Sequence, residues 1–121
     1  MKEFIARNPT IIGLKGFPKG KVEHVFPSGD VIDILFRTDR RWVGVEVKGI
    51  RSDELDLRRG LYQTVKYAAL MEACLKAEQR KLPIEVILVL SAALPETLRA
   101  EKDTLGIECR ASISVPPSFK I

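Results

Sequence analysis

The stretch VIDILFRTDRRWVGVEVKGI, residues 31–50, decides the fold that the sequence predicts. Its two halves, VIDILFR and WVGVEVKGI, are rich in β-branched and aromatic residues, and the polar residues 38–41 between them favour a turn. We therefore expect a hairpin of two β-strands. Because side chains alternate along a strand, Trp42, Gly44, Glu46 and Lys48 should share one face, with Val43, Val45 and Val47 on the other. By the same rule Val31, Asp33 and Leu35 should face oppositely to Ile32, Ile34 and Phe36.

Two carboxylates interrupt these apolar strands. Asp33 lies in the middle of the first strand and Glu46 in the middle of the second, so the hairpin should bring them together with Lys48. A carboxylate among apolar residues is costly unless a partner compensates its charge. Two such groups beside a lysine indicate a divalent metal ion and a charged substrate.

A long helix is predicted directly after the hairpin. Ser52 can cap it, Asp53, Glu54 and Asp56 suit its first turn, and apolar residues at helical spacing continue it to about Arg80. Gly60 would allow close approach to the sheet. Gln63 and Tyr67, four residues apart, lie together on one face of this helix.

The remaining elements complete an α/β pattern. Strands on both sides of the long helix make a βαβ crossover, which is normally right-handed. Further predicted elements are helical segments at Lys2–Arg7, Thr10–Leu14 and Pro95–Asp103, and strands at Lys21–Phe26, Ile84–Leu90 and Ile107–Val115. With 121 residues, 45% of them hydrophobic, we expect a single domain over residues 1–121.

The spacing of the polar residues resembles a known family. Asp33, then Glu46-Val47-Lys48, then Gln63-x-x-x-Tyr67, on strand, strand and helix, resembles the PD-(D/E)xK nuclease superfamily. The QxxxY helix is similar to its RecB-like branch, and the surrounding sequence is similar to the catalytic domain of mismatch-cleaving endonucleases. The resemblance implies a restriction-endonuclease-like core, a central mixed β-sheet flanked by helices in the order α-β-β-β-α-β-α-β.

The same resemblance implies a function and a site. The chain would be a hydrolase, a DNA endonuclease of DNA repair that depends on Mg²⁺ or Mn²⁺. Asp33 and Glu46 would bind the metal ion with the Val47 carbonyl as third ligand. Lys48 would orient the attacking water or stabilise charge on phosphorus, and Gln63 and Tyr67 would position the substrate or the motif residues. Whether Glu3, Glu23, His24 or Asp30 joins the site is left open.

The charge distribution favours a polyanionic partner. The formal net charge is +4. Residues 1–67 contain 13 Lys/Arg and 9 Asp/Glu, and residues 68–121 contain 7 of each, so the whole excess lies in the half that carries the motif. We expect DNA to lie against this half, with phosphate contacts from Arg51, Arg58, Arg59 and Lys66.

Other features bear on location and on alternative functions. No apolar stretch is long enough to span a bilayer and the first residues lack the pattern of a signal peptide, so a cytoplasmic protein without a membrane partner is expected. Cys74 and Cys109 lack zinc-binding spacing. A chain of this size should recognise the form or ends of DNA and not a long sequence, and should act as a homodimer or in a larger repair complex. The alternatives are a catalytically silent nucleic-acid-binding or assembly module of the same fold, and an unrelated α/β protein whose motif is accidental.

Overall fold

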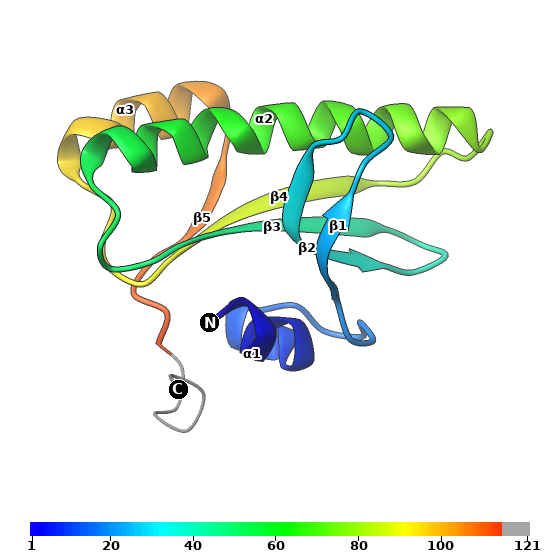
Figure 1. Ribbon diagram of the computed structural model, residues 1–121, viewed down its shortest axis with the longest axis horizontal. Helices are drawn as coiled ribbons and strands as arrows, with labels where there is room; N and C mark the ends of the chain where they lie inside the picture. The colour runs from blue at the N-terminus through cyan, green and yellow to red at the C-terminus, as the bar shows by residue number, and fades with distance from the viewer. Residues whose placement is uncertain (115–121) are drawn as a thin grey trace.

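The computed structural model describes residues 1–114 of the chain, which form a five-stranded mixed sheet with helices on both faces (Figure 1). The predicted α/β class and the predicted order of helices and strands are confirmed. In chain order the elements are α1 (Lys2–Arg7), the 3-10 helix η1 (Pro9–Ile12), β1 (Lys21–Val25), β2 (Val31–Arg37), β3 (Trp42–Lys48), α2 (Glu54–Ala77), β4 (Ile84–Leu90), α3 (Glu96–Leu105) and β5 (Glu108–Arg110).

The strands lie side by side in the order of the sequence, β1-β2-β3-β4-β5. The first three are antiparallel, as two successive hairpins dictate, and β3, β4 and β5 are parallel. Each parallel step needs a helical crossover, and two crossovers of the same hand that advance in the same direction leave their helices on the same face of a sheet. Accordingly α2 and α3 cover one face and α1 lies on the other (Figure 1).

Strand β3 has the predicted alternation. Val43 and Val45 are fully buried in the cluster that contains residues of α1, whereas Trp42 packs against Tyr67 and Met71 of α2. Gly44 lies where α2 crosses the strand. A Cβ there would come within 2.6 Å of Ile32 Cδ1 and 2.9 Å of Met71 Sδ, so only glycine fits without displacement of these neighbours.

The prediction of strict alternation along β2 is wrong at its first half. Ile34 packs on the α1 side and Leu35 on the α2 side, as expected, but Ile32 also packs on the α2 side, against Met71. The change occurs at Asp33. Opposite it on β1, Glu23 has a φ of 55°, and the β1–β2 pairing lacks this position. The local twist therefore reverses the facing of the residues before Asp33.

Helix α2 begins and ends slightly inside its predicted limits. Asp53, not Ser52, is its N-cap, because the Asp53 carboxylate accepts the Asp56 N–H at 2.8 Å. The helix ends at Ala77 instead of about Arg80. Gln79 has a φ of 56°, and the Arg80 N–H turns back to the Leu75 carbonyl at 2.8 Å, which is the hydrogen bond of a Schellman-type ending.

The last strand is much shorter than predicted. The sequence pattern predicts a strand at Ile107–Val115, but β5 spans Glu108–Arg110 and Val115 lies outside the described residues. Ser112 has a φ of 56°, which an extended strand cannot contain, so the ladder with β4 stops before it. Within residues 1–114 no helix has the length and apolar character that crossing a membrane requires.

Candidate active site

The site forms where β2 diverges from β3. Their register runs from Arg37↔Trp42 to Ile34↔Val45 and then stops. Two residues farther along β3, the Val47 N–H donates to Asp33 Oδ2 at 2.7 Å, in place of a backbone carbonyl of β2. This charge-assisted hydrogen bond fixes the Asp33 carboxylate beside Glu46. The reversal of facing at Asp33 is therefore part of how the site is built.

Glu46 is the more buried of the two carboxyl groups, with 5% of its surface exposed. Burial, then a hydrogen bond to Asp33 and the negative charge of Asp33, raise its pKa from 4.5 to about 8, against the opposing charges of Lys48 and Lys2. At neutral pH the ion-free protein therefore holds a proton between these two groups. A cation bound there would replace that proton and remove the repulsion.

Lys48 lies on the same face and packs under the start of α2. Its Cε lies 3.1 Å from the position that a Cβ on Gly60 would occupy. This confirms that Gly60 allows α2 to approach the sheet closely. The ammonium ion-pairs with Asp56 Oδ1 at 3.1 Å. Hydrogen bonds from Ser52 and Lys48 lower the pKa of Asp56. Sequence reasoning placed Asp56 in the helix N-terminus and missed this contact, since an acidic residue is common in a first turn.

A second lysine that sequence reasoning missed reaches the site from α1. Lys2 Nζ lies 2.9 Å from Glu23 Oε1 and 3.6 Å from Asp33 Oδ1. Its pKa is raised, first by the hydrogen bond to Glu23. Glu3 is exposed, so from this helix it is Lys2 that contacts the motif. Only the tertiary packing of α1 shows this, because nothing in the pattern KEFIAR marks Lys2.

The two helix residues of the motif behave differently. Tyr67 is buried, and its hydroxyl donates to the Val31 carbonyl at 2.8 Å, which fastens α2 to β2 two residues before Asp33. Burial and the nearby carboxylates, Glu46 first, raise its pKa to about 12. Gln63 is half-buried, and its Oε1 is buried without a hydrogen-bond partner among residues 1–114. An unpaired buried acceptor of this kind is costly and suits a ligand or an ordered water.

Asp33 and Glu46 form what we call the acid pair. The other carboxylate and imidazole residues, whose membership of the site the sequence left open, do not enlarge this pair. Asp30 accepts from Ser28 Oγ at 2.6 Å and ion-pairs with Lys66. His24 packs edge-on against Phe26, with 5.1 Å between ring centroids. In the part of the chain that the structure describes, no group of three or more His, Cys, Asp or Glu side chains is arranged to hold a metal ion. A metal ion here would have Asp33, Glu46 and backbone oxygen as protein ligands, a set that suits Mg²⁺ because this ion retains several waters.

The four basic residues predicted to contact phosphates fall into two groups. Lys66 is paired with Asp30, and Arg58 is paired with Glu101 at 2.9 Å and Glu54 at 3.5 Å. Arg51 and Arg59 are exposed and have no ion pair within residues 1–114. The positive charge beside the site is therefore partly neutralised inside the molecule.

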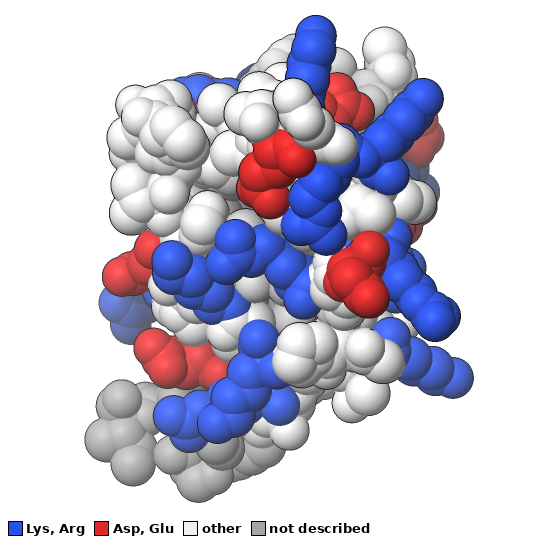
Figure 2. Space-filling model, turned by 90° about the vertical axis from the view of Figure 1, so that its right-hand side faces the viewer, with Lys and Arg blue, Asp and Glu red and all other residues white. Residues whose placement is uncertain are grey.

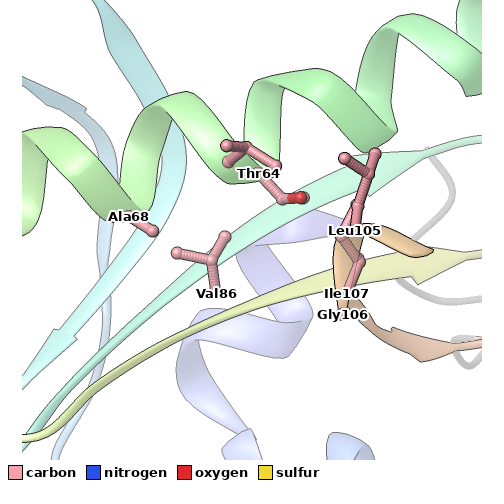
Figure 3. Close-up of a pocket in the computed structure, with 7 residues that line it drawn as sticks. Thr64, Ala68, Val86, Leu105, Gly106 and Ile107 are labelled. Carbon is pink, nitrogen blue, oxygen red and sulfur yellow. The ribbon is translucent and has the colours of Figure 1, made fainter. Parts of the chain in front are cut away.

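Two hollows lie along α2. One of about 140 Å³ opens beside Lys48, with Leu57, Leu90 and Pro95 in its apolar wall. The other, of about 200 Å³, lies between α2 and the α3–β5 connection (Figure 3). Among the side chains that line it only that of Thr64 is polar, and its hydroxyl donates to the Leu61 carbonyl at 2.7 Å. The hollow beside Lys48 is thus the one that adjoins the charged residues.

Comparison with known proteins places the fold. No protein-family model matches the chain, and no curated protein matches its sequence. Among solved structures the fold matches that of EndoMS in an EndoMS–dsDNA complex, with a TM-score of 0.66 and 22% identity over 94% of this chain and 44% of that one. It also matches a repair endonuclease from Pyrococcus abyssi, with a TM-score of 0.62 and 21% identity over 89% of this chain and 43% of that one. The chain spans less than half the length of either protein and shares the fold of that part.

Proposed function

We propose that this chain is a metal-dependent nuclease that hydrolyses DNA phosphodiester bonds and is directed by the form or ends of DNA, not by a long sequence. The observation that carries the proposal is the placement of the acid pair. Asp33, held by the Val47 N–H at 2.7 Å, lies beside the buried Glu46, with Lys48 on the same face. The shared fold with a repair endonuclease and with EndoMS, which was seen with double-stranded DNA, supports the choice of DNA.

Asp33, Glu46 and the Val47 carbonyl would hold Mg²⁺ or Mn²⁺. The environment of Glu46 fits this role, since its pKa is raised to about 8 although Lys48 and Lys2 oppose the rise, so these positive charges compensate its burial only in part. When bound, such an ion activates water and neutralises charge that develops on the phosphate. Two carboxylates satisfy only part of its coordination shell and leave room for water and a phosphate oxygen.

Lys48 would stabilise the pentavalent phosphorus or orient the attacking water. The ion pair with Asp56 at 3.1 Å and the packing under Gly60 hold its ammonium in one place before substrate arrives. A charge that is fixed beforehand stabilises a transition state without reorganisation during the reaction. The unpaired Gln63 Oε1 would accept a hydrogen bond from a water or from the substrate. Tyr67 would act as a positioning residue, through Val31.

The test combines metal binding with cleavage. Asp33→Asn and Glu46→Gln keep shape but remove ligand charge, so calorimetric titration should show loss of Mn²⁺ binding together with loss of DNA cleavage. Lys48→Ala should still bind Mn²⁺ but cleave about 10²–10³-fold more slowly, the range for loss of one fixed stabilising group. Glu72→Gln, on the exposed side of α2, is the control and should resemble the unmodified protein.

Two other results would change the assignment. If Asp33→Asn and Glu46→Gln bind Mn²⁺ as tightly as the unmodified protein, the metal site lies elsewhere. If the protein binds DNA but cleaves neither single-stranded, branched nor mismatched DNA with any divalent ion, the silent binding or assembly module is the better description. Light scattering with and without DNA tests the proposed homodimer or larger complex, because one acid pair per chain makes one cut.

A further inference from the structure

A second concentration of positive charge lies away from the acid pair. The loop 13–21 contains three lysines and no acid, and the turn region 37–41 contains three arginines and one acid. All six basic residues are exposed, and none has an ion pair within residues 1–114. We call them the hairpin-end surface: Lys15, Lys19, Lys21, Arg37, Arg40 and Arg41.

The two segments form one surface. The guanidinium of Arg41 lies 4.6 Å from the centroid of the Phe17 ring, and Phe17 in turn packs against Phe36 at 5.9 Å. Lys21 begins β1 and is paired with Leu35 of β2. Loop 13–21 therefore lies against the β2–β3 hairpin at the end of the molecule where α2 also ends (Figure 1). Figure 2 views this end directly and shows Lys and Arg side chains spread across it.

The turn that carries these arginines is fixed, and the side chains of Arg37 and Arg41 lie over aromatic rings. Thr38 Oγ1 accepts the backbone N–H groups of Arg40 at 3.1 Å and Arg41 at 3.0 Å, which fixes the turn that carries them. Arg37 lies over the Trp42 ring at 5.6 Å. A hollow of about 340 Å³ opens beside Arg37 and Trp42, and its acids are Asp39 and Glu78. Glu78 is already paired with Arg80 at 3.4 Å. Prepositioned cations lose less entropy on binding an anion.

This surface is separate from the site. Trp42 and Glu46 are four residues apart on β3, which corresponds to about 13 Å at 3.3 Å per residue, and the turn lies beyond Trp42. The turn residues Arg40 and Arg41 therefore lie roughly 20 Å from Glu46, about six steps of a DNA strand at 3.4 Å each, whereas Lys21, opposite Leu35, lies nearer to the site. Arg40 and Arg41 cannot therefore contact the phosphate that is cut.

We propose that the hairpin-end surface binds the phosphate backbone of double-stranded DNA at a distance from the bond that is cut. The inference rests on the proposed function in that DNA is the substrate. Exposed, unpaired cations that contact no base edge add affinity at any sequence, and each contact makes binding more sensitive to salt. The basic residues beside the acid pair are partly neutralised by Asp30 and Glu101, so the hairpin end is the larger source of unpaired positive charge.

The test measures binding without cleavage. A labelled 30-base-pair duplex of arbitrary sequence is titrated in chelator with the double variant Lys19→Gln/Arg40→Gln, whose side chains form no hydrogen bond or ion pair within residues 1–114. The slope of log K against log salt should fall by about 1.8, since each lost phosphate contact removes about 0.9. The affinity of the unmodified protein divided by that of the double variant should therefore decrease about tenfold between 50 and 200 mM salt.

The control has the same change in net charge. Arg99→Gln/Lys102→Gln lies on α3, where both residues are already ion-paired, and should keep the slope and affinity of the unmodified protein. If both double variants have the same slope, the hairpin-end surface does not bind DNA. Cleavage at the centre of an eight-base-pair duplex, which extends only about four steps to either side of the cut, separates this failure from failure of the proposed function. Lys19→Gln/Arg40→Gln should cleave it at the unmodified rate, whereas a protein that cleaves nothing contradicts both proposals.

Discussion

At the scale of single residues, the two acids of the site differ in the way their charge is compensated. Asp33 accepts the Val47 N–H and lies near Lys2, while Glu46 is buried and its pKa is raised to about 8. A protonated carboxyl group costs little when buried and a charged one costs much. The ion-free protein should therefore lose stability as Glu46 is forced to ionise.

The pH dependence of unfolding tests this statement. The folded pKa of Glu46 is about 8 and its ordinary value is 4.5, so between these values the unfolded chain has released a proton that the folded protein retains. The free energy of unfolding, measured with denaturant in chelator, should then decrease as pH rises from about 4.5 to 8 and level off above. In Glu46→Gln this decrease should be absent.

Other titrating groups are controlled for by comparing the pH dependence of unfolding between protein variants, because a group present in both proteins contributes to both. His24, whose pKa burial lowers, is present in both proteins and contributes equally to the pH dependence of each. Glu72→Gln, on the exposed side of α2, should keep the pH dependence of the unmodified protein. A Glu46→Gln protein that loses stability with rising pH just as the unmodified protein does would show that Glu46 is ionised in the ion-free state.

The hydrogen bond of the Tyr67 hydroxyl can be removed by deleting that hydroxyl group alone. Tyr67→Phe deletes the hydrogen bond of 2.8 Å to the Val31 carbonyl and leaves that acceptor unpaired, which should lower the free energy of unfolding by about 1–2 kcal/mol. Tyr62→Phe is the matched control, because the Tyr62 hydroxyl is 3.4 Å from Glu101 on an exposed side chain, and should cost less than about 0.5 kcal/mol. Equal losses in denaturant titration would refute a special role for the Tyr67–Val31 contact.

At the scale of elements, the crossing of α2 over β3 is set by glycines. Gly60 places the helix directly against Lys48. Gly60→Ala should keep or increase stability by up to about 1 kcal/mol, since alanine is the better helix former and the crowded atom is the end of a flexible side chain. The new Cβ would be 3.1 Å from Lys48 Cε, so the ammonium must move and cleavage should fall about 10–10²-fold.

The measurement of Gly60→Ala pairs thermal unfolding with cleavage kinetics. Gly49→Ala, whose Cβ would have no neighbour within 4 Å, is the control for a glycine replaced near the same lysine. A Gly60→Ala protein with unchanged cleavage would show that the position of Lys48 does not limit the reaction.

The sequence predicted the elements better than their irregularities. Strong apolar periodicity placed β2, β3, α2 and β4, because each pattern was long enough to be unambiguous. The short β5 and the change of facing along β2 were not predictable from pattern. Both depend on residues with positive φ, Ser112 and Glu23, at positions where glycine would have been the usual signal.

At the scale of the whole molecule, sequence reasoning placed the excess positive charge in residues 1–67 but did not predict which surface carries its unpaired part. Residues 1–67 carry it, yet much of it lies at the hairpin end and not beside the acid pair. Pairs such as Lys66–Asp30 and Arg58–Glu101 join residues 36 and 43 positions apart. Only the folded chain shows which cations such pairs neutralise.

Under the proposed function, the arrangement of helices predicts how the protein would read DNA. Major-groove recognition commonly needs a helix that projects from the protein, but α2 packs along the sheet and α3 packs beside it (Figure 1). Base-specific contacts should therefore be few, and phosphate contacts should dominate. Cleavage of a random duplex library, sequenced at the cut ends, should show cuts without any required run of four or more bases. Cuts confined to one defined sequence would mean that residues outside the described sheet and helices read the bases.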